Sequence, residues 1–287
     1  MIYARLAGGL GNQMFQYAAA RALALRNDSE VVLDLRDLRK GPRHAVFGLD
    51  RFRIRARIGQ EGELPPGRST PLRHALWRAC GRSPRFLRER GLGLNRVVLE
   101  AGDRVYLHGY WQSEGYFIDA VQDLRAEFDF AVAPRAVTAR MMETILATEA
   151  SVSVHLRRGD YVSVSGGQET HGVCDQAYYT RALQRAREEV GRDLHAFVFS
   201  DDPVWARENL RLDCKMTLVD VNDALTAYDD LRLMAACHHH VIANSTFSWW
   251  GAWLDARPEK VVIAPRKWFA DSRLVNSDIL PTGWIAT

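Results

Sequence analysis

Short apolar runs alternate with segments of helical periodicity along most of the chain. Residues 2–6 form an apolar run, the glycine-rich stretch GGLG interrupts it, and residues 13–26 carry apolar side chains at helical spacing. A second apolar run at residues 31–35 completes a pattern of strand, helix and strand. Because two strands joined through a helix lie parallel in one sheet, the chain is predicted to begin with a parallel α/β domain.

The alternation continues to the C-terminal end of the chain. Further strands are expected at residues 105–110, 152–156, 196–200, 216–219, 241–243 and 261–264. Helices are expected at residues 116–128, 135–148, 176–190, 224–236 and 248–256. Only residues 59–94 lose the pattern, and we expect a loop with helical pieces there. The sequence therefore predicts two Rossmann-type α/β domains, residues 1–134 and 135–287, that face one cleft.

Composition narrows the class of protein. Of 287 residues, 47% are hydrophobic and 25% charged, which is typical of a globular protein with a substantial core. The net charge of +3 gives no reason to expect nucleic acid as a partner. No apolar stretch approaches the ~18 residues of a spanning helix, and the opening MIYARLAGGLGNQ lacks the features of a signal peptide. We therefore expect a cytoplasmic protein.

The most informative segment is SVSVHLRRGDYV, in which His155, Arg157, Arg158 and Asp160 lie at the end of an apolar run. The carboxyl ends of parallel strands face the ligand crevice of an α/β domain. Two adjacent arginines supply permanently charged, bidentate donors that suit a diphosphate, and Asp160 can hold one guanidinium in place. The alternative is a surface ion pair, but a histidine and two arginines at one strand end favour a phosphate clamp.

The segment GGLGNQMFQYA places Gly9, Asn12 and Gln13 where a glycine turn leads into a helix. Backbone N–H groups and the positive end of the helix dipole can receive an anion at such a turn. The segment is neither G-x-G-x-x-G nor a P-loop, and the alternative is a turn that lets strand and helix pack closely. We include the three residues in the donor site.

In VIANSTFSWWGAWL, Ser245 and Thr246 precede a helix rich in tryptophan. Such residues cap helices, and the same N–H groups and hydroxyls bind phosphate oxygens, so the two interpretations are compatible. We expect Trp249, Trp250 and Trp253 to pack in the core.

Two further segments follow apolar runs. In FSDDP, Asp201 or Asp202 can accept hydrogen bonds from a base or ribose, the alternative being an N-cap of the next helix. In GYWQSEGYF, the side chains of Tyr110, Trp111 and Gln112 suit a galactose acceptor, the alternative being a core position for Trp111.

Neither a metal nor another cofactor is expected. Consecutive histidines, His238 to His240, alternate faces on a strand and do not converge on one ion. The sequence also offers no D-x-D pair to hold a divalent ion on a sugar nucleotide, so the arginines are expected to supply the positive charge instead.

The arginine-rich stretch between Arg68 and Arg90 has few acidic residues. It can meet an anionic acceptor, such as a lipopolysaccharide core or a lipid-linked pyrophosphate oligosaccharide, at the cytoplasmic face of the membrane. The alternative is a set of solvated helix faces.

Together, GGLGNQMFQYA, GYWQSEGYF, HLRRGDYV, FSDD and ANSTFSWWGAWL resemble the α-1,2-fucosyltransferases, in the bacterial branch of glycosyltransferase family 11 that lacks a membrane anchor. The resemblance runs from Gly8 to about Leu254. The H-x-R-R-x-D motif is shared with α-1,6 and protein O-fucosyltransferases. The resemblance implies a GT-B-like fold in which the C-terminal domain holds most of the donor and the acceptor approaches from the N-terminal domain.

The resemblance also implies roles for individual residues. Arg157 corresponds to the residue that grips the diphosphate, and Asp160 to one that orients the arginines. The other implied donor contacts are His155 and Arg158 along the site, Asn12 across the cleft, the loop of Ser245, Thr246 and Phe247, and Asp201 at the guanine.

By the same resemblance, the donor is GDP-β-L-fucose and the acceptor hydroxyl is O-2 of a terminal galactose. One displacement through an oxocarbenium-like transition state inverts the anomeric centre. The general base stays open among His155, Asp160 and Glu114. The alternatives are a fucosyltransferase of another linkage, another nucleotide-sugar transferase, and a glycan-binding module without enzymatic activity.

Overall fold

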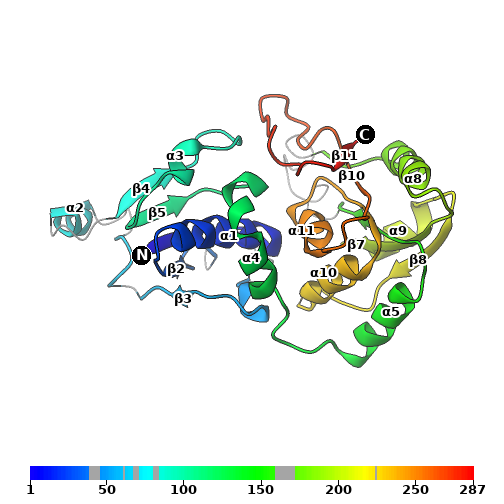
Figure 1. Ribbon diagram of the computed structural model, residues 1–287, viewed down its shortest axis with the longest axis horizontal. Helices are drawn as coiled ribbons and strands as arrows, with labels where there is room; N and C mark the ends of the chain where they lie inside the picture. The colour runs from blue at the N-terminus through cyan, green and yellow to red at the C-terminus, as the bar shows by residue number, and fades with distance from the viewer. Residues whose placement is uncertain (39–45, 61, 67–70, 80–83, 159–171, 224) are drawn as a thin grey trace. The chain divides into compact units, whose positions relative to one another are not determined.

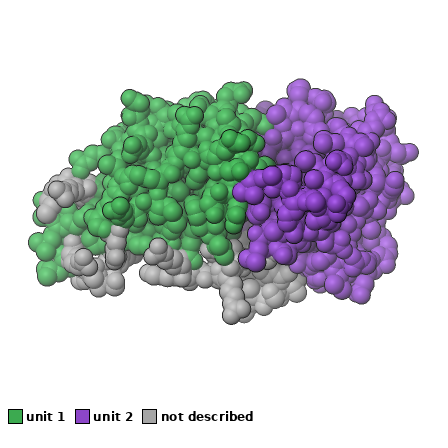
Figure 2. Space-filling model, turned by 90° about the horizontal axis from the view of Figure 1, so that it is seen from below, with its two compact units in different colours: residues 1–131 green, residues 132–287 purple. Residues whose placement is uncertain are grey.

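The computed structural model describes residues 1–38, 46–60, 62–66, 71–79, 84–158, 172–223 and 225–287 (Figure 1). The chain forms two compact units, Met1–Ala131 and Val132–Thr287 (Figure 2). The division falls within a few residues of the boundary placed after residue 134 from the sequence. No helix in the described ranges is long and apolar enough to cross a membrane.

The first unit is built on a parallel sheet with the strand order β3-β2-β1-β5-β4. Its strands are β1 (Ile2–Arg5), β2 (Val31–Asp34), β3 (Arg57–Ile58), β4 (Arg85–Arg88) and β5 (Val105–His108). Its α-helices are α1 (Leu10–Arg26), α2 (Pro71–Ala79), α3 (Arg96–Leu99) and α4 (Val121–Glu127). Short 3-10 helices are η2 (Leu49–Arg51), η3 (Glu114–Tyr116) and η4 (Ile118–Ala120).

The second unit contains a parallel sheet with the order β11-β10-β9-β6-β7-β8. Its strands are β6 (Ser151–Leu156), β7 (His195–Ser200), β8 (Lys215–Val219), β9 (His239–Val241), β10 (Val262–Ala264) and β11 (Ile285–Ala286). Its described helices are α5 (Ala136–Leu146), α8 (Gln176–Val190), α9 (Pro203–Asn209), α10 (Ala227–Ala236) and α11 (Thr246–Leu254). This is the doubly wound order, in which the chain starts at a central strand, moves outward and returns to its other side.

Helices cover both faces of the second sheet. On one face, Tyr179 of α8 shares a buried cluster with Val154 of β6 and Val198 of β7. On the other face, Leu233 of α10 packs in a separate cluster with Phe197 of β7. Because side chains alternate along a strand, neighbouring positions of β7 contribute to opposite layers. The prediction of parallel α/β architecture in two Rossmann-type units is confirmed.

Local signals set several boundaries well. Helix α8 spans the residues predicted for it, because the Asp175 carboxylate caps its start by accepting the N–H of Tyr178 at 2.7 Å. Gly191 ends it with a φ of 71°. The expected core positions of Trp249, Trp250 and Trp253 in α11 are also confirmed, since each is at most 2% exposed.

The arginine-rich stretch was predicted only in part. We expected a loop with helical pieces at residues 59–94, and α2 is such a piece, but the structure also has β4 there as a strand paired with β5. The sequence of β4 is RFLR, in which only Leu87 is buried. Its exposed arginines do not give the apolar pattern by which a strand is recognised in a sequence, because β4 lies at the edge of the sheet. The helix expected at residues 116–128 is likewise divided into η3, η4 and α4.

Candidate functional site

The carboxyl edge of the second sheet brings the HLRR and FSDD segments together. Strands β6 and β7 are parallel neighbours, and Leu156 pairs with Ser200 in their register. The residues that follow these two positions, Arg157 and Asp201, therefore leave the sheet side by side. The chain crosses from one half of the sheet to the other between β6 and β9, the point at which ligands bind in doubly wound folds.

Asp201 contacts the Arg157 side chain and the Arg158 backbone. One Asp201 carboxylate oxygen lies 3.2 Å from Nη1 of Arg157, and the other accepts the backbone N–H of Arg158 at 2.9 Å. The Arg157 and Asp201 side chains are 26% and 21% exposed, so the pair is half-buried. The orienting role that we expected for Asp160 stays a prediction. Asp160 itself lies outside the described residues.

The Arg158 side chain rests on an aromatic ring. Its guanidinium carbon lies 4.1 Å from the centroid of Trp205 in α9, which is cation–π geometry. Helix α9 begins at this point because Asp202 is its N-cap and accepts the Trp205 N–H at 3.1 Å. The N-cap alternative therefore holds for Asp202, while Asp201 faces the arginines. Nothing in the sequence around Trp205 indicated this contact.

His155 is a buried, neutral imidazole close to Arg157. It is 4% exposed, and its ring centroid lies 5.9 Å from that of Phe247. Burial, assisted by the positive charge of Arg157, lowers the pKa of His155 to about 3. No hydrogen-bond partner for its Nδ1 exists within the described residues. A group of such low pKa is a poor proton acceptor at neutral pH, so His155 suits a hydrogen bond to a ligand better than general base catalysis.

The start of α11 completes this edge. Strand β9 lies beside β6, and the chain then leads to Ser245, the N-cap of α11. The Ser245 hydroxyl accepts the N–H of Phe247 at 3.3 Å, which confirms the expected capping. Thr246 and Phe247 are partly exposed in the first turn, where helix N–H groups attract an anion. The second unit thus gathers His155, Arg157, Arg158, Asp201 and residues 245–247 at one edge of its sheet.

In the first unit, Asn12 and Gln112 meet after adjacent parallel strands. Gln112 Nε2 donates to Asn12 Oδ1 at 2.9 Å, because β1 and β5 are neighbours and both residues follow their carboxyl ends. Gly8 has a φ of 78°, and a Cβ there would lie 2.5 Å from Asn12 Nδ2, so glycine is required. At Gly9, the N-cap of α1, a Cβ would have no heavy atom within 4 Å in the described structure.

Gln13 does not face a ligand. It is fully buried, and its Nε2 donates to the carbonyl oxygens of Gly8 and Val46 at 3.0 and 2.8 Å. Its Oε1 accepts the N–H of Gly48 at 3.1 Å. Because both ends of the amide are bonded to backbone, Gln13 fixes the glycine turn, and its expected place among the donor contacts is corrected to a structural role.

Gln16 is a site-building residue that the sequence did not reveal. Its buried side chain accepts the N–H of Ala7 at 2.9 Å and donates to the carbonyl of Gly109 at 3.2 Å. It therefore ties the turn after β1 to the turn after β5. In the sequence it is one polar residue in a helical pattern, and only the pairing of β1 with β5 gives it this role.

Trp111 lies in the core, as the alternative to acceptor binding stated. It is 1% exposed and packs edge-on against Tyr116 with ring centroids 5.5 Å apart. Its φ of 56° is unusual for a large residue. Glu89, another residue that the sequence did not single out, accepts the N–H groups of Tyr110 and Trp111 at 2.7 and 2.9 Å. Tyr110 is 38% exposed and Gln112 is partly exposed, and acceptor binding by these two residues stays a prediction.

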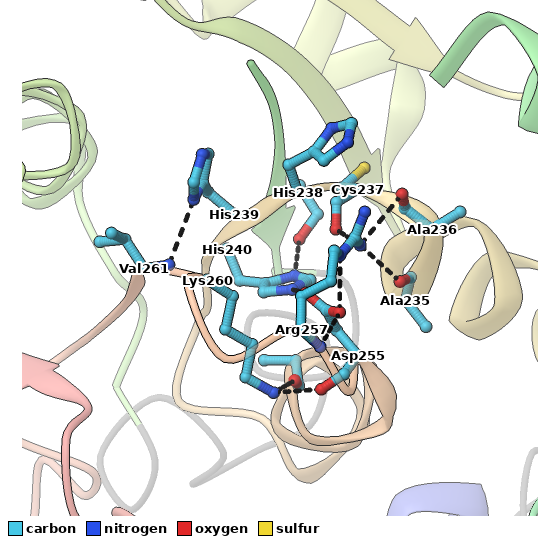
Figure 3. Close-up of polar contacts among 12 residues, drawn as sticks. Ala235, Ala236, Cys237, His238, His239, His240, Asp255, Arg257, Lys260 and Val261 are labelled. Atoms are coloured by element: carbon cyan, nitrogen blue, oxygen red, sulfur yellow. Dashed lines mark hydrogen bonds and ion pairs between the residues drawn. The ribbon is translucent and has the colours of Figure 1, made fainter. Parts of the chain in front are cut away.

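The consecutive histidines stabilise the fold. His238 Nδ1 lies 2.8 Å from the Ser151 hydroxyl, while His240 contacts Ser153 at 2.8 Å and Asp255 at 3.0 Å. Figure 3 shows these imidazoles among the polar groups that join α10, β9 and α11. Across the described part of the chain, no three His, Cys, Asp or Glu side chains form a group that could hold a metal ion. Metal independence of the reaction remains a prediction.

Comparisons with known proteins agree with these features. The family model described as "Glycosyl transferase family 11" matches residues 89–287. The chain is similar to an alpha-1,2-colitosyltransferase of Escherichia coli, with 33% identity over 99% of this chain and 98% of that protein. It is also similar to the O-antigen biosynthesis glycosyltransferase WbnK of Escherichia coli, with 30% identity over 99% of both chains.

Among solved structures, fucosyltransferase NodZ from Bradyrhizobium aligns with a TM-score of 0.48 at 13% identity, covering 87% of this chain and 91% of that one. The family match and the two full-length similarities determine the family, and with it the general class of enzyme. The protein belongs to glycosyl transferase family 11 and is a glycosyltransferase.

Proposed function

We propose that this protein transfers L-fucose from GDP-β-L-fucose, with inversion and without a metal, to O-2 of a terminal galactose in a surface-glycan oligosaccharide. The observation that carries the proposal is the Arg157 guanidinium held by Asp201 beside Arg158 at the switch point of a doubly wound sheet, since it provides fixed positive charge for a diphosphate. The names of the two similar Escherichia coli proteins support an α-1,2 linkage and an O-antigen acceptor.

In this reaction the acceptor oxygen forms a bond to C1 of fucose while the bond from C1 to the β-phosphate oxygen breaks. GDP leaves with the electron pair, and the acceptor hydroxyl loses its proton. Negative charge therefore grows on the β-phosphate, and the Arg157 guanidinium stabilises the transition state more than the ground state. The low pKa of His155 disfavours it as the base, and we assign none.

A second candidate donor is a colitosyl nucleotide. The observation that favours it is the 33% identity to a protein named alpha-1,2-colitosyltransferase along almost the whole of both chains. The clamp at Arg157 binds the part of the donor that the two nucleotides share, so it does not choose between the sugars. The difference must come from residues that contact the sugar ring.

The test is a donor screen with the purified protein. GDP-fucose, GDP-colitose, GDP-mannose and UDP-galactose are offered with a galactoside acceptor, with and without a chelator, and the product linkage is determined by NMR. We expect transfer from GDP-fucose and an α-1,2 linkage. Turnover of GDP-colitose with no use of GDP-fucose would establish the second candidate instead, and exclusive use of UDP-galactose would overturn both.

A further inference from the structure

The chain carries its excess positive charge in one stretch. Residues 64–99 contain eight arginines and one acid, Glu89, which gives this stretch a net charge of +7. Because the whole chain has +3, all the other residues together carry −4 (3 − 7). Such a local concentration of one sign is typical of a surface that binds a polyanion.

Glu89, the single acid of this stretch, offsets only one of its eight positive charges. Both carboxylate oxygens of Glu89 accept backbone N–H groups, those of Tyr110 and Trp111. Burial of Glu89 also raises the pKa of this carboxyl, although the two N–H groups oppose the shift. The neighbouring Arg88 and Arg90 side chains are exposed. The arginines around Glu89 therefore present their charge to solvent.

Helix α2 in the same stretch has an apolar stripe that faces solvent. Leu72, Ala75, Leu76 and Ala79 follow the spacing of one helix face, and all four are exposed, with Leu72 at 75% and Leu76 at 59%. A stripe of this kind normally packs against a core. Exposed leucines beside a basic surface are typical of helices that lie in the interface of a membrane.

The helix and the arginines of β4 lie at one end of the first unit. Figure 1 shows α2 beyond the sheet, next to the start of β4, which is the last strand in the order of that sheet. Trp77 of α2 and Pro84, directly before β4, line the same cavity. Arg85 and Arg88 are exposed on β4 itself. Apolar and cationic side chains are thus combined on neighbouring elements.

We propose that α2 and the exposed arginines Arg85, Arg88 and Arg90 form a docking surface for an anionic lipid bilayer. The leucines enter the boundary between headgroups and acyl chains, and the guanidinium groups bind lipid phosphates. The net charge of +7 in the stretch selects an anionic membrane over a neutral one. The surface is independent of the proposed donor site, so it can be tested without any sugar nucleotide.

The test is co-sedimentation of the full chain with vesicles of phosphatidylcholine alone or with about one third phosphatidylglycerol. We expect binding to the anionic vesicles only, weakened by salt. Replacing Arg85, Arg88 and Arg90 together by Gln should weaken binding roughly 100-fold, since each cation near the surface contributes about fivefold. Leu72→Ser with Leu76→Ser should weaken it by about tenfold or more.

Matched controls come from the second unit. Gln in place of the exposed Arg140, Arg192 and Arg207 removes the same charge elsewhere, and Ser in place of Leu225 and Val204 removes exposed apolar groups. These variants should bind as the unchanged protein does. Thermal unfolding of every variant reports whether it is folded.

Three results would overturn the proposal: equal binding to neutral and anionic vesicles, no binding to either, or unchanged binding by both patch variants. A competition with single-stranded RNA tests the assignment to lipid. The assignment is wrong, and the patch is a general polyanion site, if RNA displaces the protein from vesicles and the leucine variant binds both RNA and vesicles as tightly as the unchanged protein.

Discussion

Arg157 is held in place before a substrate arrives, because Asp201 fixes its guanidinium and a neighbouring backbone N–H at the same time. A preorganised cation needs little rearrangement as charge develops on a leaving phosphate. The same geometry explains why the two acidic residues of FSDD differ in role. Asp201 faces the arginines, whereas Asp202 caps α9.

Arg157→Lys should lower kcat by about 100-fold to 1000-fold, because lysine keeps the charge but loses the planar fork that contacts both Asp201 and a phosphate. Steady-state kinetics with the active donor measure this. Arg140→Lys on the exposed face of α5 is the control and should leave kcat unchanged. A kcat of the Arg157 variant close to that of the unchanged protein would remove Arg157 from the mechanism.

Asp201→Asn should lower kcat/KM by roughly tenfold to 100-fold, since an amide keeps the shape but not the charge that restrains Arg157. The adjacent substitution Asp202→Asn provides a matched control, because asparagine caps helices as well as aspartate does. It should leave activity and unfolding temperature nearly unchanged. Equal losses in the two variants would mean that the pairing with Arg157 has no special importance.

At the scale of elements, a buried polar network fastens α10 and α11 to β9. Arg257 donates to the Asp255 carboxylate at 2.8 Å and to carbonyl oxygens of residues 235–237 at the end of α10 (Figure 3). Lys260 donates to the last carbonyls of α11. With His240 neutral, its Nε2–H donates to Asp255 and its Nδ1 accepts the Ser153 hydroxyl. The network thereby fixes the C-terminal end of α11 against β9 and the end of α10.

Asp255→Ala should lower the free energy of unfolding by roughly 2 to 4 kcal/mol, because it leaves buried donors of His240 and Arg257 without an acceptor. Urea unfolding measures the change. The control is Asp220→Ala, which breaks an exposed pair with Arg207 and should cost at most about 1 kcal/mol. Similar losses in both variants would show that the network adds little stability.

Acid should destabilise the second unit through its buried histidines. Burial lowers the pKa of His155 to about 3 and that of His239 to about 4, where the neighbouring histidines assist. Since the unfolded value is about 6.5, the unfolded state binds more protons at lower pH. Stability is therefore full above pH 6.5 and falls as pH decreases towards those folded values.

Urea unfolding at a series of pH values tests this. Each such histidine adds up to about 1.4 kcal/mol per pH unit to the change of the unfolding free energy with pH. His155→Leu should therefore make the unfolding free energy change less with pH between pH 6.5 and about 4. A variant whose unfolding free energy changes with pH as steeply as before would show that His155 is protonated equally in both states.

For the whole molecule, the charge needed by a departing diphosphate is predicted to come from the chain itself. Transfer should therefore survive excess EDTA with less than about a twofold change, and GDP should raise the unfolding temperature without added metal. Activity that EDTA abolishes and Mn²⁺ restores would contradict the prediction.

The order of apolar runs and helical segments was enough to predict two parallel α/β units, because strand and helix periods and caps such as Asp175 are local properties of the chain. The position of HLRR at a strand end was readable for the same reason. The sequence could not show which groups meet across strands. The pairing of Leu156 with Ser200 selected Asp201 as the partner of Arg157, and the pairing of β1 with β5 joined Asn12 to Gln112.

The tertiary structure also decided which polar and aromatic residues near those ends are free to bind. Gln13 is the sequence neighbour of Asn12, and Trp111 that of Tyr110. Gln13 is nevertheless buried and hydrogen-bonded to backbone, and Trp111 is buried and packed on Tyr116. Exposure depends on contacts between residues far apart in the chain. Local pattern therefore determined the elements and the edges where chemistry can occur, and long-range packing determined which side chains at those edges can reach a substrate.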